Sequence, residues 1–490
     1  MKPLTVVAPY SGEPHFEKNM AVFSAAGPAE EILVPCPETV RFAGRRCRSL
    51  AAPDFSSSRG LRLILEACRT PYLLFLSPRT GEFLPGENAL DRFCEVAGST
   101  GAGVVYSDFY ELSRTGKTPH PLNDYQPGSV RDDFDFGPLV LFSVAAIREA
   151  LRKHGDIPEV EFAGLYDLRL KVSIDHAVHH IRQPLYTAGV DDGADHIEKI
   201  FSYVDRRNES RQKEMEKVFT EYLKAIDAYL APRFRAVERV PYPFPVEASV
   251  VIPVRNRKET IAGAVQSALS QRTKYPFNVI VVDNHSTDGT TSVLGELARR
   301  HPSLRHVVPA RRDLGIGGCW NEALLSEACG RYTVQLDSDD LYSGPDSLQK
   351  ILDLFHRDNP AMVIGSYTVV DADLQVIPPG LVDHREWTDE NGRNNALRVN
   401  GLGAPRAFNT SLMRKIGFPD VSYGEDYAAA LRICREYRIG RIFESLYWCR
   451  RWSGNTDASL TIEEANRNDA FKDGVRTAEI RARQRMNRGA

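Results

Sequence analysis

The chain has 490 residues but lacks any hydrophobic run near the ~20 residues that a membrane-spanning helix needs. Its longest apolar runs, such as residues 138–147, have the length of buried strands. The opening Met1-Lys2-Pro3-Leu4 also lacks the apolar segment of a secretory signal. We therefore expect a cytoplasmic protein, and peripheral contact with a membrane surface stays open.

Metal-knuckle and disulfide patterns are absent as well. The eight cysteines include no C-x-x-C pair, and several lie in apolar runs, as Cys68 does. We interpret them as reduced core thiols. The formal net charge is only -3, so no basic field indicates a nucleic-acid partner. The length exceeds what one core fills and predicts two or three domains.

Three segments divide the chain. Residues 1–195 alternate apolar runs with helical stretches, which is typical of α/β domains with a mostly parallel sheet. Residues 196–245 contain a charged helix with one apolar face and then a stiff stretch rich in proline, from Pro241 to Pro245. Residues 246–490 repeat the α/β pattern. The sequence thus predicts two α/β domains joined by a helical, proline-rich linker.

The first and third segments resemble each other. Residues 4–9 match 248–253, and 72–76 match 332–336. Later, Asp167 follows a glycine at the place where Asp426 does, and a helix follows both. This agreement in element order predicts an internal duplication, although two unrelated α/β domains can resemble each other by chance.

The strongest chemical signal is the acidic turn Asp337-Ser338-Asp339-Asp340, which directly follows an apolar strand. Ligands of open α/β sheets bind at the carboxyl ends of strands. Carboxylate oxygens favour Mg²⁺ or Mn²⁺, and such an ion can neutralise a departing diphosphate. The alternative is a solvated acidic turn that caps a helix.

Two neighbouring strands support the first interpretation. Residues 279–282 form an apolar run that ends at Asp283, and residues 250–253 open the segment before Arg255-Asn256-Arg257. Three strands therefore end in polar groups, and we expect these groups at one sheet edge. That is the layout of a nucleotide site.

In order and spacing, these motifs resemble family 2 glycosyltransferases with the GT-A fold. The resemblance covers residues 248–452 and rests on 250–257, 279–290, Asp313-Leu314-Gly315 with Asn321, the Asp-x-Asp motif and Gly424-Glu425-Asp426-Tyr427. It implies an inverting, metal-dependent enzyme of polysaccharide or glycoconjugate synthesis. Such an enzyme moves a sugar from a nucleotide sugar, a UDP-sugar first, to a hydroxyl of a glycan or lipid-linked acceptor.

The resemblance also implies roles for single residues. Asp283 hydrogen-bonds the donor base, Pro253, Val254 and Asn256 line the base and ribose pocket, Asp337 and Ser338 contact ribose or diphosphate, Asp339 ligates Mg²⁺ or Mn²⁺, and Asp426 is the catalytic base beside Glu425. A carboxylate against a weakly nucleophilic hydroxyl can take its proton as the new bond forms. Without the acidic turn, the Glu425-Asp426 pair would be interpreted as charges favoured by a helix N-terminus.

The chain departs from the family pattern in several places. Trp452 stands where the family often has a histidine, and Trp320 replaces an arginine before Asn321. Arg450 and Arg451 are candidates to hold the diphosphate instead, with a surface arginine pair as the alternative. Trp387 is a candidate for stacking on an acceptor sugar, with an ordinary core or surface aromatic as the alternative. Residues 454–457 are expected to form a mobile lid.

The first copy has lost the acidic turn. Ser77-Pro78-Arg79-Thr80 stands in its place, and Pro35-Cys36 replaces the Val-Asp end of the neighbouring strand, although Asp167 persists. We therefore expect residues 1–195 to be a degenerate, non-catalytic domain. Docking on the second domain, binding of acceptor glycan and self-association to a homo-oligomer all stay open as its role.

Two rival functions remain. A sugar-nucleotide pyrophosphorylase shares the acidic metal motif but has a glycine-rich loop after its first strand, and the loop 253–257 here has no glycine. A non-catalytic glycan-binding protein would not need both the acidic turn and the Glu425-Asp426 pair.

Overall fold

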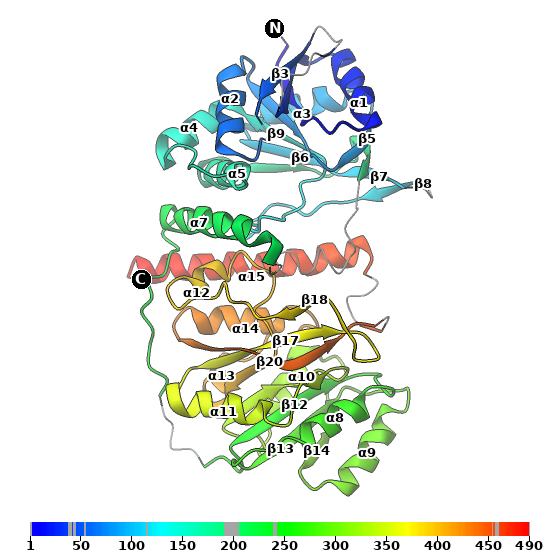
Figure 1. Ribbon diagram of the computed structural model, residues 1–490, viewed down its shortest axis with the longest axis vertical. Helices are drawn as coiled ribbons and strands as arrows, with labels where there is room; N and C mark the ends of the chain where they lie inside the picture. Colours follow the sequence, from blue (N-terminus) through cyan, green and yellow to red (C-terminus); the bar gives the residue numbers. More distant parts are fainter. Residues whose placement is uncertain are drawn as a thin grey trace. The chain divides into compact units, whose positions relative to one another are not determined.

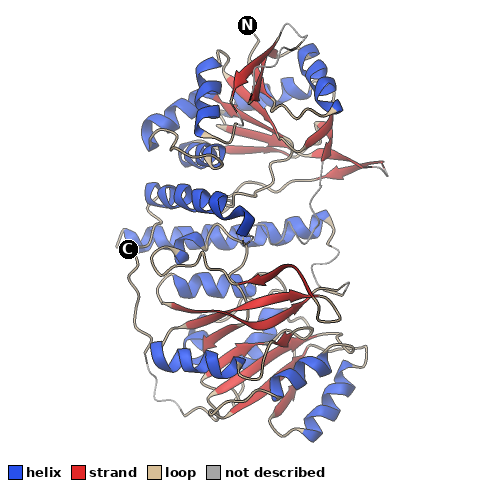
Figure 2. Ribbon diagram, viewed as in Figure 1, coloured by secondary structure: helices blue, strands red, loops and turns tan. Residues whose placement is uncertain are grey.

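The computed structural model describes residues 2–37, 42, 46–52, 55–113, 116–190, 204, 206–238, 243–452, 454–455 and 460–489. The chain forms two compact units (Figures 1 and 2). The first unit comprises Met1–Lys199, Arg207–Tyr229 and Thr461–Ala490, and the second comprises Ile200–Arg206 and Leu230–Leu460.

The first unit contains a seven-stranded sheet in the order β10-β6-β9-β4-β1-β2-β3. Its strands are β1 (Leu4–Val7), β2 (Ala29–Cys36), β3 (Cys47–Ala51), β4 (Tyr72–Leu76), β6 (Val104–Ser107), β9 (Leu139–Ser143) and β10 (Val178–Ile181). A smaller sheet pairs β5 (Thr80–Pro85), β11 (Tyr186–Val190), β7 (Phe109–Ser113) and β8 (Gly116–His120). The helices are α1 (Pro14–Ala25), α2 (Ser58–Ala67), α3 (Ala89–Thr100), α4 (Val144–His154), α5 (Gly164–Asp175), α7 (Glu209–Ala225) and α15 (Ile462–Asn487). A 3₁₀ turn, η1 (Arg206–Asn208), directly precedes α7.

The second unit is built on one larger sheet in the order β14-β13-β12-β15-β19-β17-β20-β16, with β18 paired to β17. Its strands are β12 (Ala248–Val254), β13 (Phe277–Asp283), β14 (Leu304–Val307), β15 (Tyr332–Gln335), β16 (Leu341–Tyr342), β17 (Met362–Val370), β18 (Val376–Val382), β19 (Arg406–Asn409) and β20 (Ile439–Arg450). The helices are α8 (Ile261–Leu269), α9 (Thr290–Arg300), α10 (Ile316–Leu325), α11 (Ser347–Asp358), α12 (Gly392–Asn395), α13 (Thr410–Ile416) and α14 (Glu425–Cys434).

Both large sheets have the same topology. The order β3-β2-β1-β4-β9-β6-β10 in the first unit corresponds to β14-β13-β12-β15-β19-β17-β20 in the second. In each sheet the first four strands are parallel, the fifth is antiparallel to both neighbours, and the sixth and seventh are parallel. This correspondence supports the predicted duplication.

The predicted domain boundaries differ from the units of the structure. Residues 461–490, predicted as part of a catalytic domain 246–490, belong to the first unit, as does α7 from the predicted linker. The physical reason lies in polar contacts: α15 finds its partners in residues 121–137, and α7 packs on α5. Pro241 and Tyr242 of the predicted linker lie outside the described residues.

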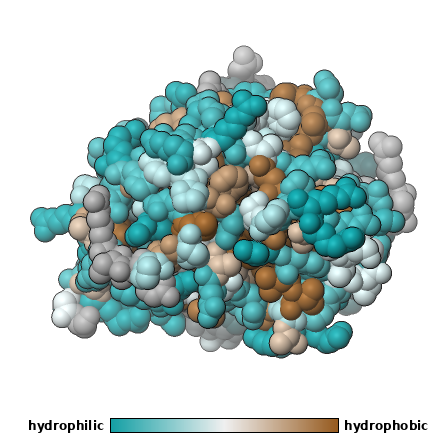
Figure 3. All heavy atoms as spheres, turned by 90° about the horizontal axis from the view of Figure 1, so that it is seen from below, coloured by the Kyte–Doolittle hydropathy of each residue, from teal (hydrophilic) through white to brown (hydrophobic). Residues whose placement is uncertain are grey.

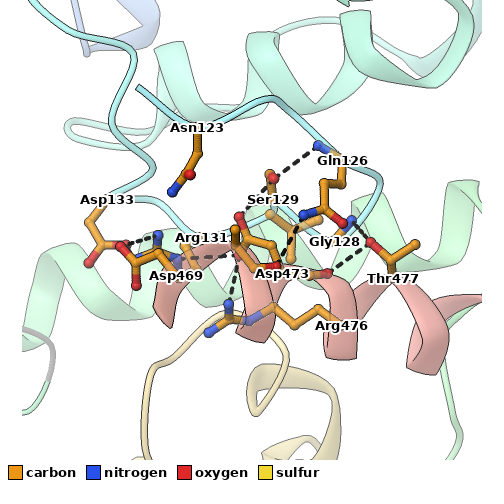
Figure 4. A network of polar contacts seen from close by, with 12 residues as sticks. Asn123, Gln126, Gly128, Ser129, Arg131, Asp133, Asp469, Asp473, Arg476 and Thr477 are labelled. Atoms are coloured by element: carbon orange, nitrogen blue, oxygen red, sulfur yellow. Dashed lines mark hydrogen bonds and ion pairs between the residues drawn. The ribbon is translucent and has the colours of Figure 1, made fainter. Parts of the chain in front are cut away.

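Helix α15 begins with a capping box. The Thr461 hydroxyl accepts a hydrogen bond from the Glu464 amide (3.2 Å), and the Glu464 carboxylate accepts one from the Thr461 amide (2.9 Å). Residues 121–137 then hold the helix (Figure 4). Ser129 Oγ donates to Asp473 Oδ2 (2.8 Å), and the buried Arg131 contacts Asp473 at 3.6 Å. Burial raises the pKa of Asp473, and Arg131 opposes that effect.

Gly128 lies directly against the backbone of α15. A Cβ added there would lie 2.1 Å from the Asp473 carbonyl oxygen and 2.4 Å from the Thr477 amide nitrogen. Replacing Gly128 by valine is therefore expected to push α15 away and to cost about 1–3 kcal/mol of unfolding free energy. Hydrogen exchange of peptides from residues 462–487 should become faster, and calorimetry should show a lower Tm.

Gly474 offers a matched control on α15 itself. A Cβ there would have its nearest neighbour, Gln126 Oε1, at 3.9 Å, which is ordinary contact. Gly474→Ala should keep exchange of α15 slow and should slightly stabilise the helix, because alanine favours helix more than glycine does. Unchanged exchange in Gly128→Val would contradict the role of this contact.

Surface properties bear on the membrane question. Among the described residues, no helix is both long and apolar enough to cross a bilayer. The face shown in Figure 3 is mainly hydrophilic, with hydrophobic residues in several separate areas. All eight cysteines are free thiols, and five of them are buried.

Candidate functional site

The predicted site residues follow strands whose carboxyl ends meet at one edge of the second sheet. Strand β12 is parallel to both β13 and β15, so the carboxyl ends of these three strands lie at the same edge of the sheet. Pro253 and Val254 end β12, Asp283 ends β13, and Asp337 follows β15 after one residue. The strands form here because their segments are mainly apolar or β-branched and are buried on both faces.

Asp283 is fully buried and is held by protein groups. Its carboxylate accepts hydrogen bonds from the Ser286 amide (3.0 Å) and the Thr291 hydroxyl (2.5 Å), and His306 Nε2 lies 3.3 Å away. Burial of Asp283 opposes ionisation, but these hydrogen bonds outweigh it and lower the pKa. The side chain that organises the turn after β13 is thus Asp283, and His306 is a neighbour that the sequence did not reveal.

Asn256 joins the two loops next to this position. Its φ of 53° lies in the left-handed region, which asparagine tolerates better than most residues. The Asn256 amide donates to Ser286 Oγ (2.9 Å), and its side-chain oxygen accepts from the Thr287 amide (2.7 Å). Asn256 therefore fixes the loop after β12 against the turn after β13.

The acidic turn holds its carboxylates in different surroundings. Gln335 Nε2 donates to both oxygens of Asp337, at 3.0 and 3.1 Å. Asp340 is buried and accepts from the Arg450 amide at 2.8 Å. Burial, followed by the nearby Asp337 and Asp339 charges, raises the pKa of Asp340 well above its usual range. Ser338, which follows Asp337 in the sequence, is also buried.

Asp339 is partly exposed, and its contacts are weaker. Trp452 Nε1 and Asn455 Nδ2 each lie 3.3 Å from Oδ2, and Arg257 Nε lies 3.8 Å from it. Trp452, at the position of the family histidine, thus does reach the carboxylate predicted to hold the metal. The predicted lid begins at Gly454 and Asn455, whereas Thr456 and Asp457 lie outside the described residues.

The fit of a divalent ion can be judged from these contacts. Within the described ranges, no group of three or more His, Cys, Asp or Glu side chains is arranged to hold a metal. Asp339 would therefore be one protein carboxylate, with diphosphate oxygens and water as further ligands. Mg²⁺ is commonly bound in this way, so the residues fit Mg²⁺ or Mn²⁺ at Asp339.

Basic groups lie beside Asp339. The Arg450 guanidinium donates through Nε to the Asp339 carbonyl oxygen, and its Nη2 is buried without a hydrogen-bond partner among the residues that the structure describes. A buried donor of this kind is costly unless a ligand satisfies it. The backbone amide of Arg451 donates to the Val370 carbonyl (2.8 Å) and continues the edge of β17.

The predicted base lies in the first turn of α14. Gly424, with φ of 79°, lets the chain enter the helix, and Glu425 and Asp426 follow directly. Asp426 Oδ2 forms an ion pair with Arg406 Nη2 at 2.7 Å. Glu425 is buried, and burial together with the Asp426 charge raises its pKa to about 8.

Arg406 and Gln335 connect the two groups of carboxylates. Arg406 Nη1 donates to Gln335 Oε1 (3.0 Å), and Gln335 in turn holds Asp337. The acidic turn and Asp426 therefore lie on one continuous network of contacts, as the predicted chemistry requires. The sequence did not single out either linking residue, because 71 positions separate them.

Trp387 lies in another environment. Its ring packs against Gly392, where a Cβ would be 2.6 Å from ring carbon Cδ2, and the Arg441 guanidinium lies 5.8 Å from the ring centre. Among the described residues, no hydrogen bond joins Trp387 to Asp339 or Asp426. Its surroundings are those of a half-buried packing residue, and an acceptor role stays a prediction.

Two cavities lie elsewhere in the second unit. One, of about 380 Å³, opens near the start of β15 and is lined by residues that include Glu247, Arg331 and His356. The other, of about 240 Å³, lies between α13 and α14 and includes Arg432 and Tyr437. Neither contains a predicted site residue, so the carboxyl edge stays the candidate site on the basis of its chemistry.

The corresponding edge of the first unit has no acidic turn. Ser77 follows β4, the strand that corresponds to β15, and Arg79 comes two residues later. Asp167, in the first turn of α5, forms an ion pair with Lys171 at 2.8 Å. Burial raises the pKa of Asp167, and Lys171 opposes that effect.

The second unit is thus a mixed α/β fold with an acidic turn at the carboxyl edge of its sheet, as the predicted fold class requires. The sequence model of glycosyl transferase family 2 matches residues 249–417 of this chain. This match confirms the predicted resemblance to family 2 glycosyltransferases over residues 249–417.

Similar proteins match over part of their length. Chondroitin synthase from Escherichia coli is 38% identical over 111 residues, which are 22% of this chain and 15% of the synthase. An uncharacterized Mycobacterium tuberculosis protein is 33% identical over 102 residues, 21% of this chain and 29% of that protein. The chain thus spans less than a third of these relatives. The crystal structure of S. aureus TarS 1-349 in complex with UDP-GlcNAc has 21% identity and a TM-score of 0.37, and the match covers 49% of this chain and 73% of that one.

Proposed function

We propose that the second unit transfers a sugar from a nucleotide sugar, a UDP-sugar first, to a hydroxyl of a glycan or lipid-linked acceptor. The transfer inverts the anomeric carbon and serves polysaccharide or glycoconjugate synthesis. The observation that carries this proposal is the network in which Arg406 pairs with Asp426 and bonds to Gln335, while Gln335 holds Asp337 of the acidic turn that contains Asp339. The local similarity to chondroitin synthase supports a polysaccharide as the product class.

On the acceptor side, Asp426 acts as the general base. The acceptor oxygen forms a bond to the anomeric carbon while its proton passes to the Asp426 carboxylate. The bond between the anomeric carbon and the diphosphate oxygen breaks, and the nucleoside diphosphate leaves with the electron pair. Burial and the Asp426 charge raise the pKa of Glu425, whereas Asp426 pairs with Arg406, so Asp426 is the member of the pair proposed to act as the ionised base.

On the donor side, charge builds up on the departing diphosphate. A divalent ion held by Asp339 would supply Lewis-acid stabilisation of that charge. Arg450, whose Nη2 has no hydrogen-bond partner within the described part of the chain, would donate to a diphosphate oxygen, and Arg257 lies beside Asp339. Pro253, Val254 and the turn fixed by Asp283 and Asn256 form the base end of the pocket in this proposal.

The first unit is proposed to be a non-catalytic copy. The absence of a carboxylate from residues 77–80 and the pairing of Asp167 with Lys171 support this view. Its contribution, as a docking surface, an acceptor-binding domain or a contact between copies of the chain, is left to experiment. A cytoplasmic location, with peripheral membrane contact for a lipid-linked acceptor, belongs to the same proposal.

A donor panel tests the function. The full chain is incubated with UDP-, GDP- and TDP-sugars and Mn²⁺ or Mg²⁺, and release of nucleoside diphosphate is measured with and without glycan acceptors. We expect slow hydrolysis of one UDP-sugar, loss of that activity with a chelator, and faster release with the right acceptor. Asp339→Ala protein from the same purification excludes a contaminating hydrolase.

Other outcomes would support the rival functions. Formation of a nucleotide sugar from a nucleoside triphosphate and a sugar 1-phosphate would indicate a pyrophosphorylase. Glycan binding without turnover of any donor would indicate a binding protein, and either result would overturn the proposal.

A further inference from the structure

Arg406 occupies a central place in the candidate site. It starts β19, next to β15, and its guanidinium lies between two side chains that hold different ends of the site. Nη2 contacts Asp426 Oδ2 at 2.7 Å, and Nη1 donates to Gln335 Oε1 at 3.0 Å. The Arg406 backbone amide also donates to Gln335 Oε1, at 3.2 Å. This second bond fixes which way the Gln335 amide faces.

Gln335 passes the constraint to the donor side. With its oxygen engaged by Arg406, its Nε2 is directed to both oxygens of Asp337. An amide is suited to this place because it accepts from a guanidinium and donates to a carboxylate at the same time. A glutamate or leucine could not do both. The Asp337 amide in turn donates to the Tyr447 hydroxyl at 2.9 Å, which anchors the start of the acidic turn.

We propose that Arg406 and Gln335 are positioning residues that orient the catalytic base and hold it at a fixed place relative to the donor-side carboxylates. This inference rests on the proposed function, since it concerns the transfer that Asp426 would promote. Asp426 Oδ1 accepts a hydrogen bond from the Tyr427 amide at 2.7 Å. With Arg406 on Oδ2, the carboxylate plane is fixed from two sides.

Charge gives Arg406 a second effect. The charged groups near Asp426 include Arg406 from β19 and Glu425 on its own helix, and Asp337 acts on both of these neighbours. An acid neighbour such as Glu425 disfavours a second negative charge. The Arg406 guanidinium, 2.7 Å from Asp426 Oδ2, favours the ionised form of Asp426. Without it, the base should lose its proton only at higher pH.

The test compares pH profiles of kcat/KM for sugar transfer. In Arg406→Met we expect kcat to fall about 100-fold. The acid limb of the profile should move up by about one pH unit or more, because an opposite charge within hydrogen-bond distance is lost. The Kd for the UDP-sugar, measured by calorimetry, should change by less than about threefold, a near-neutral effect on the affinity scale. Arg406→Lys should restore the acid limb without restoring the full rate, because lysine keeps the charge and loses the planar fork.

Controls separate this role from folding and from the proposed function. Arg432→Met removes an arginine from α14, the helix that carries Asp426. Arg432 pairs with Glu436, so this variant should leave the pH profile unchanged. Gln335→Leu should lower kcat with little movement of the acid limb, and it carries the test if Arg406→Met does not fold. Parent-like kcat/KM at every pH in Arg406→Met, or a full parent-like kcat in Arg406→Lys, would overturn the inference. Failure of the parent enzyme to turn over any donor would overturn the proposed function instead.

Discussion

Asp426→Asn is expected to lower kcat for sugar transfer by about 100- to 10,000-fold while leaving donor affinity nearly unchanged. Asparagine has almost the same shape as aspartate. Its side-chain oxygen, in the first turn of α14, can still accept a hydrogen bond from Arg406 of β19. What it lacks is the capacity to take a proton from the acceptor hydroxyl. The effect should therefore appear in kcat, measured as release of nucleoside diphosphate at saturating donor and acceptor.

The first unit supplies a matched control for this substitution. Asp167 lies in the first turn of α5, which corresponds in place to α14, and it pairs with Lys171. Asp167→Asn should leave transfer unchanged, although it removes a buried ion pair and can lower the Tm. Equal losses of activity in both variants would point to a general effect on folding. Normal kcat in Asp426→Asn would remove Asp426 from the mechanism.

Much of this site could be predicted from local sequence. Strands β12, β13 and β15 lie in mainly apolar segments that give way to polar residues within one or two positions, so their ends mark one sheet edge. The first turn of α14 was also predictable, because Gly424 and two acids precede an apolar helix. These signals lie within a few residues of each other and need no tertiary information.

What the sequence could not predict depends on contacts between distant residues. Arg406 becomes important only because β19 pairs with β15 and brings it to Gln335. Asp283 was predicted to contact the donor base, and its bonds to Ser286 and Thr291 became visible only with the fold. Its role toward the donor stays a prediction.

The C-terminal helix shows the same limit on a larger scale. We predicted from the sequence that residues 461–490 belong to the second domain, because they follow that domain in the chain. The partners of α15, Ser129 and Arg131, lie more than 330 positions earlier and are polar residues in a segment without a periodic pattern. Local periodicity carries no information about such a return of the chain to the first unit.

Asp339→Ala is expected to reduce metal-dependent turnover by about a thousandfold, since several kcal/mol of charge stabilisation depend on the bound ion and each 1.4 kcal/mol is a factor of ten. The fold should tolerate the change, because Asp339 is partly exposed and its hydrogen bonds from Trp452 and Asn455 are long, at 3.3 Å. The direct measurement is the titration of Mn²⁺ into parent and variant in the presence of nucleoside diphosphate. Binding of the ion should become much weaker in the variant.

A second acid tests whether the effect is specific to the ion. Asp346 is exposed, pairs with Lys350 at 3.0 Å, and precedes α11 in the same stretch of chain. Asp346→Ala removes one negative charge without touching the carboxyl edge, so turnover and Mn²⁺ affinity should stay as in the parent. If Asp339→Ala kept normal turnover and normal Mn²⁺ affinity, the ion would be held elsewhere or not used. Since Asp340 is bonded to the Arg450 amide and Asp337 to Gln335, both are less open to an ion, and the metal assignment would then fail for the whole acidic turn.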